Sequence, residues 1–346
     1  MKIGITYNLK DDLSPDAIVN DEFAEEFDSA ATIDAICGVL QQEGYDSVKL
    51  GGTLDIVGRI NKENIDFVFN IAEGACGRNR ESHVPSLLEM CDMPYSGSDP
   101  LTLGLTLDKI MTKKIAYYAG IPTPNYKVIW QSEDLKTIEN VLRYPLITKP
   151  AWEGSSKGIY NSSKVSDGDN LKKNVKLLRE KYPHQPILVE EYIEGKEITV
   201  GVIGNNPAQI LGVMEIVNKH LPGEDLLYSL EVKKDWRNLV DYLVPANVGK
   251  LEDRHIRHYA LSAFREFGCR DIARVDFKLS RSQNKIFLLE INPLPGLSPE
   301  YADLVIMSRK AGIEYRDLVL SILYQGFSRY ESLGKMVKIS RVGLKL

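Results

Sequence analysis

Short apolar runs and a helical pattern alternate at the start of the chain. Residues 2–7, 46–50 and 67–71 are apolar runs of strand length and predict buried strands. Between the first two, apolar positions within 27–43 recur at helical spacing, and Gly44 fits the position just after a helix end. This order of strand, helix and strand predicts a parallel α/β unit.

The pattern changes to separate strands and loops after about residue 100. Strands are predicted at 146–149 and 187–191, with a loop rich in Gly and Ser at 151–158 between them. Two later apolar runs, 272–279 and 286–291, flank a polar turn and predict a β-hairpin. We also expect a helix that ends at Gly120, an exposed basic helix over 172–181, a strand over 197–203 and a closing helix that includes 318–323.

Composition narrows the class of protein. The 346 residues suffice for two or three domains, and 43% hydrophobic with 26% charged residues is ordinary for a globular chain. A formal net charge of −5 argues against nonspecific electrostatic binding of nucleic acid. The four cysteines show no zinc-ligand spacing, and neither a signal peptide nor an apolar run of membrane-spanning length is visible. We therefore expect a cytoplasmic protein without nucleic-acid or membrane partners.

The strongest chemical pattern lies in the predicted hairpin. One strand carries Arg274-Val-Asp276, and the next carries Glu290-Ile-Asn292. Alternation places Glu290 and Asn292 on one face, and Asp276 can face them across the hairpin. Two carboxylates and an amide oxygen are hard ligands that suit Mg²⁺, whose other positions take water and phosphate. A solvated acidic face is the alternative, but the strands are otherwise apolar.

Two more segments fit a nucleotide. Lys149 ends a predicted strand, and the loop 151–158 after it has free backbone N–H groups that can cover phosphates. No GxxxxGK[ST] sequence occurs in the chain. The acidic strand end 189–197 can hydrogen-bond an adenine edge and hold ribose hydroxyls, although a charged strand end is the simpler interpretation when it is taken alone.

These segments, in this order, resemble the ATP-grasp superfamily and, within it, the D-alanine–D-alanine ligase group. The resemblance extends from about residue 67 to about residue 323, and its motifs are specific only in combination. The matching stretches are Val68-Phe-Asn-Ile71, Met93-Pro-Tyr-Ser-Gly97-Ser, Leu107-Asp-Lys109, Lys149-Pro with Glu153-Gly-Ser-Ser156, Glu190-Glu-Tyr-Ile with Glu197-Ile-Thr, Arg274-Val-Asp276-Phe, and Glu290-Ile-Asn292-Pro with Pro295-Gly296.

The resemblance implies an α/β (α+β) fold of three domains, which we expect at 1–100, 101–192 and 193–346. ATP would lie between the sheets of the second and third domains. The implied reaction phosphorylates a carboxylate to an acyl phosphate with release of ADP, and a bound amine then displaces phosphate to form an amide. The implied cofactors are ATP and two Mg²⁺ ions, for which Mn²⁺ can substitute, and the resemblance suggests a homodimer.

The resemblance also assigns roles position by position. The residues expected to contact ATP are Lys109, Lys149, Glu190, Glu191, Ile193 and Glu197, with Glu197 near the ribose. The implied metal ligands are Asp276, Glu290 and Asn292. The implied catalytic groups are Arg274 and the Gly296 N–H at the oxyanion, and Ser155, Ser156 and Lys233 on segments that close over the site.

The substrate half departs from the family pattern. Glu73 stands where the family has a histidine, and Arg78 and Arg80 follow it. Tyr301, preceded by Glu300, replaces the serine that binds the second substrate's carboxylate. The bulk of Tyr301 and the negative charge of Glu300 disfavour D-alanine as acceptor, unless the two residues only cap the next helix and point to solvent. The two arginines could instead hold an extra carboxylate of the first substrate. The candidate substrate residues are Glu26, Asp28, Glu73, Arg78, Arg80, Glu300 and Tyr301.

We therefore expect an ATP-dependent carboxylate–amine ligase that acts on an amino acid or small peptide. One alternative is a strict D-alanine–D-alanine ligase of cell-wall synthesis. Another is a nucleotide-binding partner protein that has lost turnover, against which the intact Arg274, Asp276, Glu290 and Asn292 argue.

Overall fold

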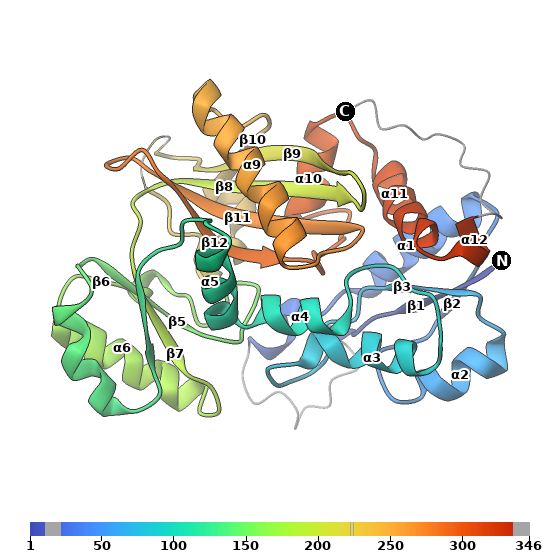
Figure 1. The fold of residues 1–346 in the computed structure, drawn as a ribbon, viewed down its shortest axis with the longest axis horizontal. Coiled ribbons are helices and arrows are strands. Elements are labelled where there is room, and N and C mark those ends of the chain that lie inside the picture. Colours follow the sequence, from blue (N-terminus) through green and yellow to red (C-terminus); the bar gives the residue numbers. More distant parts are fainter. Residues whose placement is uncertain (11–21, 222, 224, 335–346) are drawn as a thin grey trace.

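The computed structural model of the protein describes residues 1–10, 22–221, 223 and 225–334. Within these residues the strands form sheets of three, four and five strands, with helices packed around them (Figure 1). The predicted mixed α/β class is confirmed. No helix in the described part of the chain is both long and apolar enough to cross a membrane.

The first sheet is the predicted parallel unit. Its order is β2-β1-β3, from β1 (Lys2–Thr6), β2 (Asp46–Lys49) and β3 (Phe67–Asn70), and both pairings are parallel. The helix between β1 and β2, α1 (Ala30–Gln42), begins three residues later than expected because the Ser29 side chain accepts a hydrogen bond from the Thr32 N–H and caps it. The other helices of this region are η3 (Phe23–Glu26), α2 (Ile56–Glu63), η4 (Arg80–Ser82) and α3 (His83–Met90).

The four-stranded sheet contains the two strands predicted around the Gly-Ser loop. Its order is β4-β7-β5-β6, and every pairing is antiparallel. The strands are β4 (Tyr126–Ile129), β5 (Leu146–Pro150), β6 (Lys164–Val165) and β7 (Ile187–Glu191). The basic helix α6 (Gly168–Lys181) covers one face through buried Leu171, Val175 and Leu178 and leaves Lys172, Lys173 and Lys176 in solvent.

The five-stranded sheet has the order β10-β9-β8-β11-β12 and is antiparallel throughout. Its strands are β8 (Gly195–Gly204), β9 (Ala208–Asn218), β10 (Val240–Leu243), β11 (Ile272–Ser280) and β12 (Ile286–Asn292). The last two form the predicted hairpin. Helix α9 (Lys250–Glu266) packs on the sheet through Ile256, Ala260 and Phe264.

The remaining helices connect and cover these sheets. They are α4 (Pro100–Leu107), α5 (Lys109–Tyr118), η5 (Ser132–Asn140), η6 (Asn161–Ser163), α7 (Leu230–Lys234), α8 (Trp236–Leu239), α10 (Asp303–Lys310), α11 (Tyr315–Ser328) and α12 (Glu331–Gly334). Helix α11 packs on the first sheet beside α1 (Figure 1), and the rings of Phe67 and Phe327 lie 4.6 Å apart. Both ends of the described chain therefore share one core. The three domain boundaries stay a prediction.

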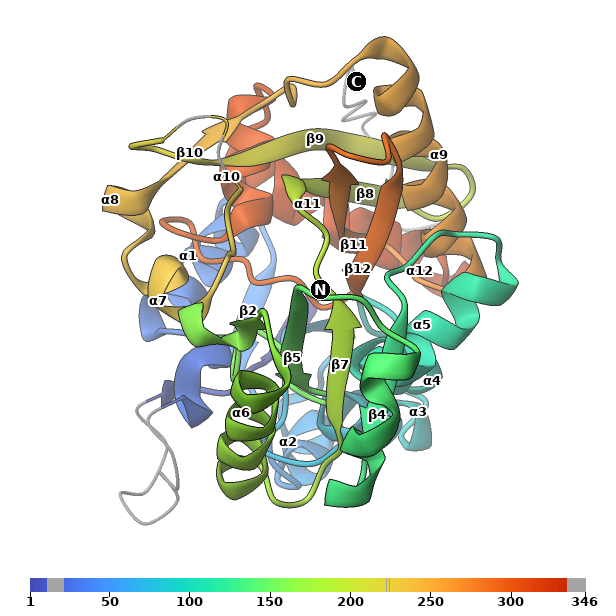
Figure 2. The same cartoon turned by 90° about the vertical axis from the view of Figure 1, so that its left-hand side faces the viewer.

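The two antiparallel sheets face each other across the centre of the molecule. In Figure 2, β5 and β7 lie below β8, β11 and β12. Strand β7 leads directly into β8 through 192–194, so the chain passes from one sheet to the other at this point. The site described next lies where the two sheets meet.

Candidate active site

The first pocket lies between the four-stranded and five-stranded sheets and measures about 930 Å³ including its open mouth. This volume suits a drug-sized small molecule. Ile147, Ile216 and Leu289 supply apolar walls. The pocket brings together all six residues predicted to contact ATP with most of the predicted catalytic and metal-binding residues, namely Lys109, Lys149, Glu190, Glu191, Ile193, Glu197, Ser155, Ser156, Lys233, Arg274, Asp276 and Glu290.

Two buried lysines bind one carboxylate on the β7 side of this pocket. Glu190 is fully buried and lies 2.8 Å from the Lys113 Nζ and 2.9 Å from the Lys149 Nζ. Burial alone would raise the pKa of Glu190, but the two lysines outweigh it and hold the pKa below its usual value. The Glu190 side chain therefore positions lysines, and any contact with an adenine edge would fall to the backbone of this strand end.

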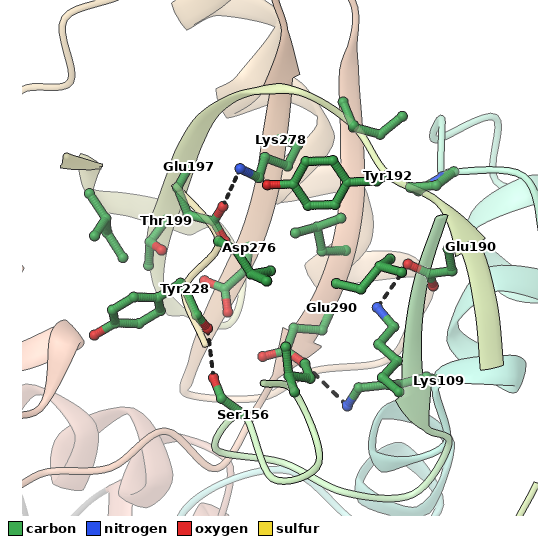
Figure 3. A pocket seen from close by; sticks show the side chains of 18 of the residues that line it. Lys109, Ser156, Glu190, Tyr192, Glu197, Thr199, Tyr228, Asp276, Lys278 and Glu290 are labelled. Atoms are coloured by element: carbon green, nitrogen blue, oxygen red, sulfur yellow. Dashed lines mark hydrogen bonds and ion pairs between the residues drawn. The ribbon is translucent and has the colours of Figure 1, made fainter. Parts of the chain in front are cut away.

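A second ion pair lies on the β8–β11 side. Glu197, predicted near the ribose, is 2.9 Å from the Lys278 Nζ, and Lys278 also donates to the backbone oxygen of Leu226. Tyr192 covers Lys278 at 5.6 Å from its ring centre. Figure 3 shows Glu197, Lys278 and Tyr192 around one end of the pocket, with Lys109 and Glu290 at the other.

The hairpin brings the predicted metal ligands together in register. Asp276 pairs with Glu290 and Arg274 pairs with Asn292 across β11 and β12. The Arg274 Nε donates to both carboxylate oxygens of Asp276, at 3.1 and 3.0 Å, and Nη2 reaches Glu290 at 3.4 Å. Lys109 lies 3.3 Å from the other oxygen of Glu290. Arg274 and Lys109 thus hold both carboxylates in place.

The two hairpin carboxyls have opposite pKa shifts. Burial, reinforced by neighbouring Glu290, raises the pKa of Asp276 to about 6 although Arg274 opposes it. Burial also acts on Glu290, but Lys109, Arg274 and Lys149 outweigh it and lower its pKa to about 2. At neutral pH Glu290 is therefore fully ionised, and Asp276 is the carboxyl whose charge a nearby cation would further stabilise.

The donor set fits Mg²⁺ only as part of a shared site. In the described ranges, no group of three or more His, Cys, Asp or Glu side chains is arranged to hold a metal ion. Asp276 and Glu290 supply two hard oxygen donors, and the Asn292 Oδ1 accepts a hydrogen bond from the Leu294 N–H at 2.9 Å. Mg²⁺ commonly uses one or two carboxylates together with substrate phosphates.

Two segments meet over the mouth of the first pocket. The Gly-Ser loop carries Ser155 and Ser156, both at positive φ. The Ser156 hydroxyl donates to the Tyr228 backbone oxygen at 3.1 Å, and the Leu230 N–H donates to the Ile159 oxygen at 2.8 Å. These bonds join the loop to α7, whose Lys233 faces the pocket with a pKa that burial lowers.

A second pocket continues from the first toward the N-terminal sheet. Ser155, Lys233 and Arg274 line both pockets, so the two spaces meet at the predicted catalytic residues. The second pocket contains several of the predicted substrate and catalytic residues, namely Glu26, Asp28, Glu73, Asn292, Gly296 and Tyr301. Tyr301 is 43% exposed and its phenol faces this space.

Three predicted substrate residues lie elsewhere. Arg78 pairs with Asp108 and lies over Trp152, and Glu300 is an exposed residue 3.5 Å from Arg237. Arg80 is buried behind the second pocket. None of the three lines the pocket. The structure therefore gives no support to the idea that the two arginines hold a substrate carboxylate there.

Glu26 is bound by the protein itself. Its carboxylate accepts from the Arg80 Nη2 at 2.8 and 2.9 Å, from the Lys157 Nζ at 2.8 Å and from the Gly154 N–H at 2.8 Å. Burial would raise the pKa of Glu26, but Arg80 and Lys157 reverse this and lower it to about 2. Glu26 thus ties the N-terminal segment to the Gly-Ser loop.

Comparisons with known proteins agree with this geometry. A family model described as the C-terminus of D-ala D-ala ligase matches residues 115–324. A D-alanine–D-alanine ligase of Carboxydothermus hydrogenoformans is 36% identical over 86% of this chain and 93% of its own length. The chain belongs to the D-alanine–D-alanine ligase family. It is accordingly an ATP-dependent ligase that forms C–N bonds.

Solved structures of D-alanine–D-alanine ligases have the same fold as this chain. A Bacillus anthracis ligase complexed with ATP superposes with a TM-score of 0.71 at 22% identity and covers 97% of this chain and 100% of its own. A D-Ala:D-Ser ligase from Enterococcus faecalis also has a TM-score of 0.71, at 21% identity, and covers 94% and 99%. The expected ATP-grasp architecture is confirmed.

Two residues of this ligase-family site were not anticipated from the sequence. Lys113 lies one helical turn after Lys109 on α5, and Lys278 lies two residues after Asp276 on β11. The spacing of four on a helix and of two on a strand places each on the face of a residue already singled out. This spacing is the feature of the sequence from which both lysines could have been predicted as site residues.

Proposed function

We propose that the protein joins the carboxylate of an amino acid or small peptide to an amine through an acyl phosphate, with release of ADP and phosphate. The observation that supports this most is the junction of the two pockets at Ser155, Lys233 and Arg274. A nucleotide in the first pocket and a carboxylate in the second would meet there. The finer roles below rest on the same proposal.

The first pocket would hold ATP with its phosphates toward the hairpin. Lys109 and Lys149 lie at that end, already fixed by Glu290 and Glu190, and would neutralise phosphate charge. The apolar walls and the 190–197 strand end would hold the base and ribose. Closure by the Gly-Ser loop would exclude water, which an acyl phosphate requires.

Asp276, Glu290 and Asn292 would hold Mg²⁺ together with the phosphates. When bound, the metal supplies charge neutralisation on the triphosphate. The chain's own contribution is to keep both carboxylates oriented through Arg274 and Lys109. Arg274 faces both pockets and, with the Gly296 N–H, is suited to stabilise the oxyanion that forms when the amine attacks.

The amine acceptor is the least constrained part of the proposal. Tyr301 presents one phenolic hydroxyl where a small hydroxyl residue would suit a D-alanine carboxylate. This favours an acceptor other than D-alanine. D-alanine–D-alanine ligation is the second candidate, and the 36% identical ligase supports it. We further propose a cytoplasmic homodimer without nucleic-acid or membrane partners.

An ADP-release assay over pairs of amino acids tests the proposal. ADP and phosphate that appear only when a carboxylate and an amine are both present support the proposal. AMP and pyrophosphate as products would instead indicate an acyl adenylate intermediate and contradict the acyl phosphate. Release with D-alanine alone would promote the second candidate. ATP binding without ADP release for any pair would support an inactive partner protein.

A further inference from the structure

The second pocket has an uneven charge balance. It measures about 1250 Å³ including its mouth, which is more than the first pocket. Several carboxylates from separated parts of the chain line it. Three of them have cations within the protein: Glu25 lies 3.1 Å from Lys234, Glu26 is held by Arg80 and Lys157, and Asp303 lies 4.0 Å from Arg274.

Three further carboxylates line the same pocket and have no such partner. We call Asp28, Glu73 and Glu81 the acidic wall. Among the described residues, no side chain forms an ion pair or hydrogen bond with any of the three carboxylates. Glu81 is the clearest case because it is 8% exposed and still faces the cavity without a partner.

Unpartnered carboxylates in such a site are costly to ionise. Burial raises the pKa of both Asp28 and Glu81 to about 7 and raises that of Glu73 well above its usual value. A buried charge is normally paired, because removal from water is expensive. A cation that entered this pocket would supply the missing partner for all three groups.

The charge count also separates two kinds of substrate. Glu26 already has Arg80, Lys157 and the Gly154 N–H around it, so it has little left to offer an ammonium group. A simple amino acid brings one ammonium, and its carboxylate must face the first pocket to react. Lys10 also lines the pocket and opposes the rise in the pKa of Asp28, and Arg80 does the same for Glu73 and Glu81, but neither forms an ion pair with the acidic wall. Three carboxylates without an ion-pair partner in a pocket of this size still exceed what one ammonium requires.

We propose that the acidic wall binds a second cationic group, so that the amino-acid substrate of the second pocket has a side chain ending in an ammonium or guanidinium. This inference rests on the proposed ligase function. Asp28, Glu73 and Glu81 act as binding residues that select the substrate, and the reacting carboxylate is still positioned by Arg274 and Lys233.

Matched substrate pairs give the sharpest test. Lysine is compared with norleucine, ornithine with norvaline, and arginine with citrulline, in both enantiomers, each with ATP, Mg²⁺ and a panel of amines. Each pair keeps the carbon chain and removes the charge, and only citrulline also keeps the number of side-chain heavy atoms. We expect ADP release with kcat/KM about 10²-fold higher for the cationic member, because a site built for a polar group is left unpaired by the analogue that lacks it.

The variant Glu81→Gln tests the wall itself. It keeps the side-chain shape, and we expect it to reduce the ratio of cationic to neutral kcat/KM by roughly 10-fold while the KM for ATP stays within about twofold. Glu180→Gln, at an exposed position on α6, is the matched control and should leave the ratio unchanged. Thermal unfolding of each variant checks that it is folded.

The outcomes are distinguishable. Equal ADP release with neutral and cationic members would overturn the inference and leave the ligase function standing. An unchanged ratio in folded Glu81→Gln would overturn the assignment to the acidic wall. No ADP release with any pair, while ATP still binds, would overturn the proposed function and this inference together.

Discussion

The two pockets of this ligase balance their charges in different ways. In the first, the buried Glu190 and the partly buried Glu197, Asp276 and Glu290 each have a lysine or arginine within about 3.4 Å. In the second, the acidic wall has no cation of the protein within ion-pair distance among the described residues. The first pocket therefore pairs its carboxylates within the chain, whereas the second contains carboxylates that we assign to a cationic substrate.

If ATP binds in the first pocket and the amino acid in the second, as we propose, this difference marks where members of one ligase family can diverge. A site that binds the same nucleotide in every member can fix its charges internally. A site that selects among amino acids must instead leave some of its charged groups unpaired, so that they can bind the substrate. The D-Ala:D-Ser ligase with the same fold shows by its name that the acceptor differs within this architecture.

The largest effect is expected at the hairpin of the first pocket. Glu290→Gln removes the charge that Lys109 and Arg274 hold in place and that we assign to Mg²⁺. We expect turnover to fall by roughly 10²–10³-fold, by analogy with the loss of one transition-state stabiliser. ADP release at limiting Mg²⁺ measures this. Glu180→Gln is the control, and near-normal turnover in folded Glu290→Gln would remove the metal assignment.

The next largest effect is expected from Glu26, which links the N-terminal segment to the Gly-Ser loop. Glu26→Gln leaves Arg80 and Lys157 buried beside a neutral amide, with Glu153 as their remaining carboxylate at 3.9 and 2.6 Å. Breaking a buried ion pair costs up to about 3–5 kcal/mol, and because Glu153 remains, the free energy of unfolding at pH 7 should fall by about 1–3 kcal/mol. Urea unfolding measures it, with Glu180→Gln expected within about 0.5 kcal/mol of the unmodified protein. A loss below about 1 kcal/mol would contradict the internal role of Glu26.

The pH dependence of the same variant follows from its pKa. Glu26 has a pKa of about 2 in the folded protein against an ordinary value of 4.5. Its stabilisation is therefore fully present above the ordinary value and is lost as the pH falls through the folded value. The difference in unfolding free energy between the unmodified protein and Glu26→Gln should shrink as the pH falls from 4.5 to 2.

A smaller effect is expected when the pH is changed, on the preference of the second pocket for a cationic substrate. Asp28 and Glu81, with pKa values near 7, are mostly neutral at pH 6 and mostly ionised at pH 8. The preference for lysine over norleucine should therefore rise by about tenfold across this range. The ratio cancels effects of pH on the chemistry shared by both substrates. A flat ratio would contradict a role for ionised Asp28 and Glu81. The charged groups around these two carboxyls are Lys10, Glu26, Glu73, Arg80, Lys109 and Lys157.

The smallest effect is a change of selectivity at Tyr301. Tyr301→Ser shortens a side chain that is already 43% exposed, so it should not disturb the fold. We expect the order of preferred amines to change by several-fold while the KM for ATP stays within about twofold, because Tyr301 lines only the second pocket. A change confined to the KM for ATP would contradict this placement.

The sequence predicted the first pocket better than the second, for a physical reason. Strand alternation and the apolar runs fixed the register that pairs Asp276 with Glu290, so local pattern was enough. The acidic wall combines residues 28, 73 and 81, which only the tertiary fold brings together. Arg80 was predicted to bind substrate because no local sequence pattern indicates its ion pair with Glu26, which lies far away in the chain. Strand β9 was not predicted, although most residues between 208 and 218 are apolar, which is a signal of a buried strand.

The most direct test of the whole account uses D-alanine as the sole amino acid. The unmodified protein is given D-alanine, ATP and Mg²⁺, and the dipeptide and ADP are quantified together, beside the same reaction with lysine and an amine panel. The account predicts little D-alanyl-D-alanine and substrate-dependent ADP with a cationic amino acid. Efficient D-alanyl-D-alanine synthesis, without response to the cationic substrates, would contradict it.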